Sequence, residues 1–354
     1  MPVALRAFFV EGLVKKHSVL RIIVAAAAAL LIGVTAPASA SGQNLGSSIK
    51  VDKLTFPVTL SSGTANVVAY FYYHGSYENR PLQVLVHGAT YNHTYWDFQP
   101  VNGEGYSYAR HMAAQKYAVL ALDLPGAGES DHPAGETLGL ADQAATIIQV
   151  IGAMRSGENP VGHAFNSIIL VGHSAGSIAA TVAQGNGHPA DALVLTASRH
   201  LVNEVLDFPV TQAILPQLFQ LVGIFQSVPY FFIPEPARSG LFYYPPSIDP
   251  DVMAIDAANA DQWTNGQLTS TFFAFLDPRI DQPWLVTGPV LIQLGTNDVL
   301  FPAGLPGVET ALWASTTPEI QTLTDIGHDF NLHLNHAQSW QAIDAWIRAN
   351  VAKK

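Results

Sequence analysis

The sequence predicts an α/β protein with a doubly wound, mostly parallel β-sheet flanked by helices. Two patterns predict this class. Short apolar runs recur along the chain without the polar alternation of a half-exposed strand, and most are followed directly by Gly or Asp. Segments whose apolar residues recur at helical spacing lie between these runs. Strands buried on both faces that alternate with helices are typical of parallel sheets built from βαβ units.

The expected strands begin with a hairpin. Two extended segments, 51–59 and 65–73, are separated by the turn sequence SSGT. Buried strands are then expected at 82–86, 118–122, 168–171, 192–195 and 290–294. Their short length and their Val, Ile and Leu content favour strands over helices.

Helical periodicity is clearest at 138–154, where Leu140, Ile147 and Ile151 fall on one stripe, and again near the C-terminus at 337–347. The segment 201–289 breaks the alternation, because it is rich in aromatic residues and proline and contains no clear short strand. Since it lies between two expected strands, we expect an insertion over the edge of the sheet and not a separate domain.

Residues 1–40 have the pattern of a signal peptide. Basic residues precede an apolar run at 22–34, and the small residues at 38–40 follow at the spacing that a signal peptidase recognises. The run is short for a membrane span, so we expect cleavage after Ala40, a secreted or extracytoplasmic protein and no stable membrane anchor. An uncleaved anchor helix is the alternative. The mature chain then consists of a core in two parts, 41–200 and 290–354, around the insertion.

Composition excludes several classes of function. The 354-residue chain has a formal net charge of −11, and removal of the more basic leader makes it more negative. This charge argues against nucleic acid and anionic membranes as partners. The sequence contains no cysteine, which excludes thiol chemistry, disulfides and cysteine-ligated metals. Nothing in the sequence indicates an oligomeric state.

Reactive side chains follow the expected strands. Ser174 lies in the sequence GHSAG directly after the strand at 168–171, Asp298 follows the strand at 290–294, and His328 lies in a later loop. The carboxyl ends of parallel strands meet at one edge of a sheet, so these residues are expected to lie close together. Glycines at 172 and 176 remove side chains that would crowd a strained turn. The alternatives are non-catalytic: Ser174 would lie in an ordinary strand-to-helix turn, and Asp298 would cap a turn.

The G-x-S-x-G motif, the His-Gly pair at 87–88 and the later Asp and His resemble the α/β-hydrolase family from about residue 51 to the end. The resemblance implies that Ser174 is the nucleophile, His328 its base and Asp298 the carboxylate that orients the base. It also implies an oxyanion hole formed by the backbone N–H groups of Ala89 and Ala175. The insertion at 201–289 corresponds to the cap of this family.

Other residues near these motifs have less certain roles. His333 and His336 are rivals for the base, but both fall on a segment expected to be helical. Thr90, His93, Trp96 and His173 are candidates for the substrate pocket. For His93 a structural role is favoured over substrate contact, and Asp123 is interpreted as a loop-holding residue. The apolar insertion favours an ester or lactone with an apolar part, although a role as the core of the cap explains its composition equally well.

No cofactor or metal is expected. The histidines at 328, 333 and 336 lack an accompanying carboxylate motif, and the sequence GAGES lacks the lysine of a phosphate-binding loop.

The sequence therefore predicts a secreted serine hydrolase that cleaves a carboxylic ester of a small or moderately hydrophobic substrate through an acyl-enzyme. A lactonase would use the same triad. An exported aminopeptidase would need an acidic recess, for which Glu204, Asp207 and Glu235 are candidates. A cofactor-free lyase, a perhydrolase and a non-catalytic binding protein on this fold are further alternatives. The expected partner is a small-molecule ester or lactone.

Overall fold

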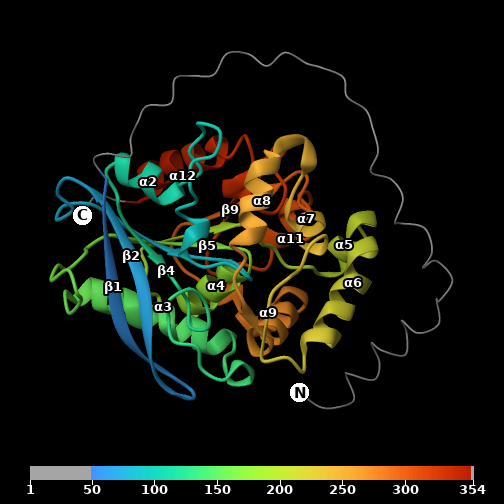
Figure 1. Ribbon diagram of the computed structural model, residues 1–354, viewed down its shortest axis with the longest axis horizontal. Coiled ribbons are helices and arrows are strands. Elements are labelled where there is room, and N and C mark those ends of the chain that lie inside the picture. The colour runs from blue at the N-terminus through green and yellow to red at the C-terminus, as the bar shows by residue number, and fades with distance from the viewer. Residues whose placement is uncertain (1–48, 352–354) are drawn as a thin grey trace. The chain divides into compact units, whose positions relative to one another are not determined.

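The computed structural model describes residues 49–351, so the predicted signal peptide and its cleavage site lie outside the described residues. An eight-stranded sheet has the order β1-β2-β4-β3-β5-β6-β9-β10 (Figure 1). Its strands are β1 (Ile49–Leu60), β2 (Gly63–His74), β3 (Leu82–Val86), β4 (Ala118–Leu122), β5 (Ile168–His173), β6 (Ala192–Thr196), β9 (Val290–Gly295) and β10 (Glu319–Leu323). β2 is antiparallel to β1 and β4, and every pairing from β4 to β10 is parallel.

Helices cover both faces of the sheet, which confirms the doubly wound prediction. In Figure 1, α2 (Tyr108–Ala114) and α12 (Ala337–Asn350) lie above the sheet, and α3 (Leu140–Ser156) and α4 (Ala175–Gly187) lie below it. Neighbouring residues of one strand enter opposite layers. Val84 packs in the cluster that contains residues of α3 and α4, whereas Leu85 packs in the cluster of α2 and α12. This burial on both faces explains why the strands read as continuous apolar runs.

Most elements follow the local sequence signals. β3 and β4 have the predicted bounds, and α3 begins two residues after the predicted start and ends at Gly157, whose φ of 83° is left-handed. β10 and α2 were not predicted. β10 is an edge strand in which only Leu323 is buried, so it lacks the apolar run that identifies the inner strands.

The chain changes direction across the sheet at β3. The connection from β3 leads to β4 on one side, whereas the connection from β5 leads to β6 on the other side. Loops that leave neighbouring strands in opposite directions open a crevice at the carboxyl end of the sheet. The residues after β3 and β5 therefore flank this crevice.

The insertion, residues 201–289, lies between β6 and β9 and occupies the right of Figure 1. It contains α5 (Asn203–Leu206), α6 (Pro209–Phe225), α7 (Ala237–Phe242), α8 (Pro250–Ala258), α9 (Asn265–Leu276) and α10 (Pro278–Asp281). It also contains a ribbon of two short strands, β7 (Tyr230–Phe231) and β8 (Trp263–Thr264), which the sequence did not indicate. No helix within residues 49–351 is long and apolar enough to cross a membrane.

A buried charge cluster holds the base of the insertion. His200 precedes the insertion, and its ring contacts Asp281 of α10 at 3.0 Å and Glu309 of α11 (Pro306–Thr310) at 2.8 Å. Burial opposes the charged ring, but the two carboxylates outweigh it and raise the pKa of His200 to about 10. A cation between two carboxylates thus joins the start of the insertion, its last helix and the second part of the core.

Candidate active site

Ser174 stands on a sharp turn between β5 and α4. Its φ is 51°, in the left-handed region that residues other than glycine rarely adopt. A Cβ at position 172 would lie 2.6 Å from the Cα of Ser177, and one at position 176 would lie 2.4 Å from the carbonyl oxygen of His87. Only glycine fits at either position, so the packing of the turn requires both glycines of the GHSAG sequence.

The structure brings the three predicted catalytic residues together. His328 Nε2 lies 2.8 Å from Ser174 Oγ, and His328 Nδ1 lies 3.0 Å from Asp298 Oδ2. The backbone N–H groups of Leu300 and Phe301 donate to Asp298 Oδ1 at 2.9 and 3.0 Å. These bonds orient the carboxylate so that it accepts from Nδ1–H, which leaves Nε2 free to accept the serine proton.

The environment of His328 favours its charged form. The side chain is 2 % exposed, and this burial disfavours the charge. The hydrogen-bonded Asp298 carboxylate and the nearby Asp329 outweigh burial and raise the pKa of His328 above 6.5. A base whose cation is stabilised in this way is suited to hold a proton during a reaction at Ser174.

Ala89 and Ala175, the residues predicted to form the oxyanion hole, both line the cavity beside Ser174. Ala175 is the first residue of α4, so its N–H has no partner within the helix. Ala89 follows β3 and lines the cavity beside Ser174. The loop that carries it is close to the turn, because a Cβ at Gly88 would lie 3.1 Å from the Cβ of Ser174. Two backbone N–H groups beside a serine are the kind of donors that could stabilise a developing oxyanion.

Ser174 opens into a small apolar cavity of about 100 Å³. Its polar side chains are those of Ser174 and His328, and α6 and α9 of the insertion supply much of the wall. The remaining lining residues are Ala89, Ala175, Leu201, Leu218, Val222, Phe225, Phe231, Ile233, Leu241, Phe242, Trp263, Leu268, Phe272, Phe275, Leu300 and Phe301. The cavity is therefore suited to an uncharged, apolar group bound next to the serine.

The prediction that Thr90, His93, Trp96 and His173 line the substrate pocket is not supported by this cavity, because none of them belongs to its wall. Thr90 is buried and accepts a hydrogen bond from Arg238. His93 binds Asp123, whose carboxylate also accepts from the backbone of Glu129, so Asp123 holds the loop as interpreted from the sequence.

Trp96 and His173 lie in the interior behind the turn. Trp96 packs edge-on against Tyr95, with ring centroids 5.0 Å apart, and His173 stacks on Tyr95 at 4.3 Å. His173 Nδ1 lies 3.1 Å from Thr196 Oγ1. The sequence thus places these residues near the site motifs, but it does not give the direction of their side chains.

The rival histidines have structural roles. His333 Nδ1–H donates to the carbonyl oxygen of Asp329, and His333 Nε2 accepts from the N–H groups of Gly327 and Tyr244, so the ring bridges the loop around His328 to the insertion. Burial lowers the pKa of His333 to about 4, which keeps it neutral. His336 contacts the carbonyl oxygen of His333. Within residues 49–351, no group of three or more His, Cys, Asp or Glu side chains could hold a metal ion.

Sequence reasoning missed a buried group beside the site: Tyr91, Arg238, Asp256 and Asp329. A signal for Arg238 was present. Between Asp207 and Asp249, the only charged residues are Glu235 and Arg238. A lone cation in such an apolar stretch is expected to be solvent-exposed or paired with a buried carboxylate.

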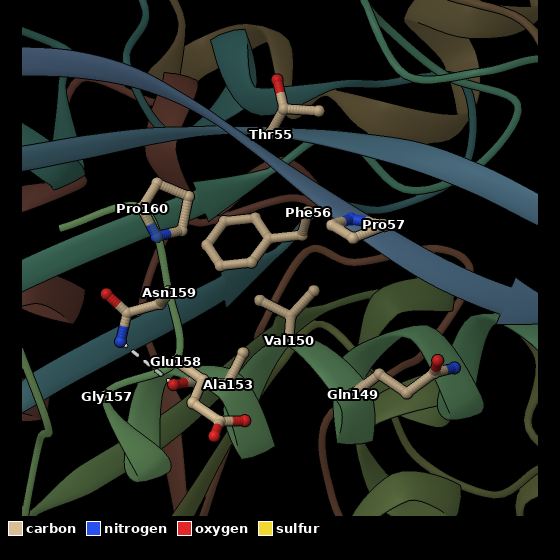
Figure 2. Close-up of a pocket in the computed structure, with 10 residues that line it drawn as sticks. All are labelled: Thr55, Phe56, Pro57, Gln149, Val150, Ala153, Gly157, Glu158, Asn159 and Pro160. Carbon is tan, nitrogen blue, oxygen red and sulfur yellow. Dashed lines mark hydrogen bonds between the residues drawn. The ribbon is translucent and has the colours of Figure 1, made fainter. Parts of the chain in front are cut away.

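A larger groove of about 410 Å³ lies elsewhere, between β1, the end of α3 and the loop that follows (Figure 2). It includes the apolar side chains of Phe56, Val150, Ala153 and Pro160 and shares no residue with the cavity at Ser174. Because its lining contains no serine or histidine, size alone does not identify the reactive site.

Comparison with known proteins gives the class of the protein. The profile of the Alpha/beta hydrolase family matches residues 83–340, and the chain belongs to this family. A search of curated proteins found no significant match.

Solved structures share the fold at low sequence identity. An esterase from Thermogutta terrifontis has a TM-score of 0.57 at 16% identity, covering 84% of this chain and 99% of its own. A monoacylglycerol lipase from Paleococcus ferrophilus has a TM-score of 0.56 at 16% identity, covering 85% and 99%. An esterase from Exiguobacterium antarcticum has a TM-score of 0.53 at 17% identity, covering 82% and 98%. These likenesses establish the α/β-hydrolase fold of this chain.

The reactivity of Ser174 is expected to depend on the ionisation of His328. The rate of labelling by a fluorophosphonate should rise with pH through a midpoint above 6.5, because His328 must be neutral to accept the serine proton. Asp298→Asn should move the midpoint downward and slow labelling by roughly 10²–10⁴-fold. The measurement is a pH series of labelling rates. Asp325→Asn, which removes an exposed carboxylate from the loop that carries His328, is the control. An unchanged midpoint in Asp298→Asn would contradict the assignment.

Proposed function

We propose that this protein is a serine hydrolase that cleaves carboxylic esters of small or moderately hydrophobic substrates through an acyl-enzyme. One observation carries the proposal. The hydrogen-bonded series Asp298–His328–Ser174 ends at an apolar cavity beside the N–H groups of Ala89 and Ala175. Membership of the Alpha/beta hydrolase family is consistent with it.

The proposed reaction uses these groups in turn. His328 accepts the proton of Ser174 as Oγ attacks the ester carbonyl carbon, and the N–H groups of Ala89 and Ala175 donate to the resulting oxyanion. His328 then gives the proton to the leaving alcohol, and the acyl group remains on Ser174. Water loses a proton to His328, attacks the acyl carbon and releases the carboxylic acid and Ser174.

The walls of the cavity favour an ester over a peptide with a free amino terminus. No carboxylate lines the cavity among the residues that the structure describes, so a substrate ammonium group would be buried without a partner. Glu204, Asp207 and Glu235 are all exposed and lie outside the cavity wall. The acidic recess that an aminopeptidase would need is therefore not supplied by these residues.

The size of the cavity favours a short acyl group. Its volume of about 100 Å³ is somewhat smaller than the roughly 150 Å³ cavity that holds a benzene ring. In this proposal the insertion acts as the cap of the enzyme, with α6 and α9 closing the acyl pocket. Phe272 of α9 is buried in this wall and packs edge-on against Phe219 of α6.

We also propose that the protein is exported and that residues 1–40 are removed as a signal peptide. N-terminal sequencing of the protein recovered from the medium or the periplasm should begin at Ser41. A first residue within the apolar run at 22–34, or retention of the whole leader, would contradict this expectation.

Ser174→Ala is expected to abolish hydrolysis of p-nitrophenyl acetate and butyrate, because it removes the hydroxyl that His328 Nε2 contacts. The measurement is initial rates for the purified mature protein. Ser177→Ala, which removes a buried hydroxyl bonded to the Thr196 carbonyl oxygen, is the matched control and should keep most of the activity. A γ-lactone in the same substrate panel tests the lactonase alternative. Equal turnover by wild type and Ser174→Ala would contradict the proposal.

Phe272→Ala is expected to shift the preferred acyl chain from short to medium length. Removal of the ring enlarges the cavity, and each additional buried methylene contributes about 0.8 kcal/mol to binding. The measurement is kcat/KM for p-nitrophenyl esters from acetate to decanoate. Phe273→Ala, on the same helix but outside the cavity wall, should leave the chain-length profile unchanged. If Phe272→Ala and Phe273→Ala had the same chain-length profile, the acyl chain would bind elsewhere.

A further inference from the structure

The loop that carries the Ala89 N–H has an unfavourable backbone conformation. Thr90, the next residue, has a φ of 59°, in the left-handed region that β-branched residues rarely adopt. Such a conformation persists only where the surrounding structure holds it in place. The contacts of Thr90 therefore hold the residue that directly follows Ala89, and through it the loop in which the Ala89 N–H lies.

Both polar contacts of Thr90 come from the insertion. Arg238 Nη1 of α7 donates to Thr90 Oγ1 at 2.8 Å, and the N–H of Asp261 donates to the Thr90 carbonyl oxygen at 2.9 Å. Asn92, two residues later, donates from its side-chain amide to Asp261 Oδ2 at 2.7 Å. The loop after β3 is thus held by Arg238 and Asp261 of the insertion, which are far away in the sequence.

Arg238 is itself held rigidly. Its Nε and Nη2 donate to the two carboxylate oxygens of Asp256 on α8, at 2.8 and 3.1 Å. The guanidinium lies 4.4 Å from the ring centre of Tyr91 and 5.0 Å from that of Phe242. The side chain is 1 % exposed, so a donor with this planar geometry is fixed by its carboxylate partner before any substrate binds.

The same group reaches the loop of the base. The Tyr91 hydroxyl lies within hydrogen-bonding distance of both Asp256 and Asp329. The N–H of Asp329 donates at 3.0 Å to the carbonyl oxygen of Phe242, the last residue of α7. Asp329 directly follows His328. α7 therefore contacts the loop after β3 at one end and the loop of the base at the other.

We propose that Arg238 is a positioning residue for the oxyanion hole: through Thr90 it sets the position of the Ala89 N–H before substrate binds. The chemical consequence rests on the proposed function, because only an acyl-transfer reaction develops an oxyanion at this point. A preorganised donor stabilises the transition state more than the ground state. Loss of the Arg238–Thr90 bond therefore lowers kcat and leaves KM nearly unchanged.

Thr90→Val and Thr90→Ser form a matched pair that tests this role. Valine keeps the branched shape and removes the acceptor, whereas serine keeps the acceptor, and neither change disturbs the Arg238–Asp256 pair. For p-nitrophenyl acetate, Thr90→Val should lower kcat by about tenfold to a hundredfold with KM within about twofold. n-Butylboronic acid forms a tetrahedral adduct with Ser174. Its inhibition constant should rise by the same factor by which kcat falls. Thr90→Ser should stay within about threefold of wild type in both measurements.

Arg238→Lys supplies the second arm. Lysine keeps a charge for Asp256 but lacks the planar fork that reaches Asp256 and Thr90 together. Its loss of kcat should match that of Thr90→Val, and the double variant should lose no more than either single variant, because both remove the same bond. The role is overturned if Thr90→Val retains kcat and boronate affinity, if Thr90→Ser loses as much as Thr90→Val, or if the two losses multiply.

Failure of this inference is distinguishable from failure of the proposed function. The rate of Ser174 labelling by a fluorophosphonate also depends on the oxyanion hole and needs no ester turnover. Wild-type protein that labels but cleaves no ester would reject the proposed function, while the labelling rate of Thr90→Val relative to Thr90→Ser would still decide the role of Arg238. A lower rate in the valine variant supports the role, and equal rates reject it.

Discussion

The site depends on the close contact between the turn at Ser174 and the end of β3. Gly176 lies so near the β3 backbone that a Cβ there would be 2.4 Å from the carbonyl oxygen of His87 and 2.5 Å from that of Val86. No other residue type permits this approach. The contact brings the start of α4, which carries the Ala175 N–H, beside the loop after β3, which carries the Ala89 N–H. The reversal of strand order at β3 supplies the crevice into which Ser174 opens.

Charged groups around the crevice are buried as pairs. Arg238 is paired with Asp256, and His200 lies between Asp281 and Glu309. Removing one member of such a pair leaves an uncompensated charge and costs about 3–5 kcal/mol. The ion pairs of His200 with Asp281 and Glu309 join the insertion to the core, and Arg238 joins it to the core through its hydrogen bond to Thr90. The apolar cavity lies beneath the insertion so held.

The insertion therefore has two physical roles. Its apolar side chains on α6 and α9 form the wall of the cavity, which excludes water from the serine. Its polar groups on α7 and in the segment before β8 contact the loops after β3 and around His328. A segment whose composition suggests only a cover over the sheet is thus also part of the framework that holds the reactive groups.

The sequence by itself determined those features that depend on neighbours along the chain. The bounds of β3 and β4 follow from short apolar runs, and the turn at Ser174 follows from glycines two residues to either side. The positions of Ser174 and Asp298 after two predicted parallel strands placed them at one edge of the sheet, and the family resemblance added His328 from a later loop. Tertiary structure decided the rest. Thr90 and His173 lie beside the catalytic motifs in sequence, yet their side chains turn away from the cavity. Arg238 bonds to a residue 148 positions earlier. Periodicity and turn chemistry are local, whereas side-chain direction and the pairing of buried charges depend on packing between distant segments, which no local pattern encodes.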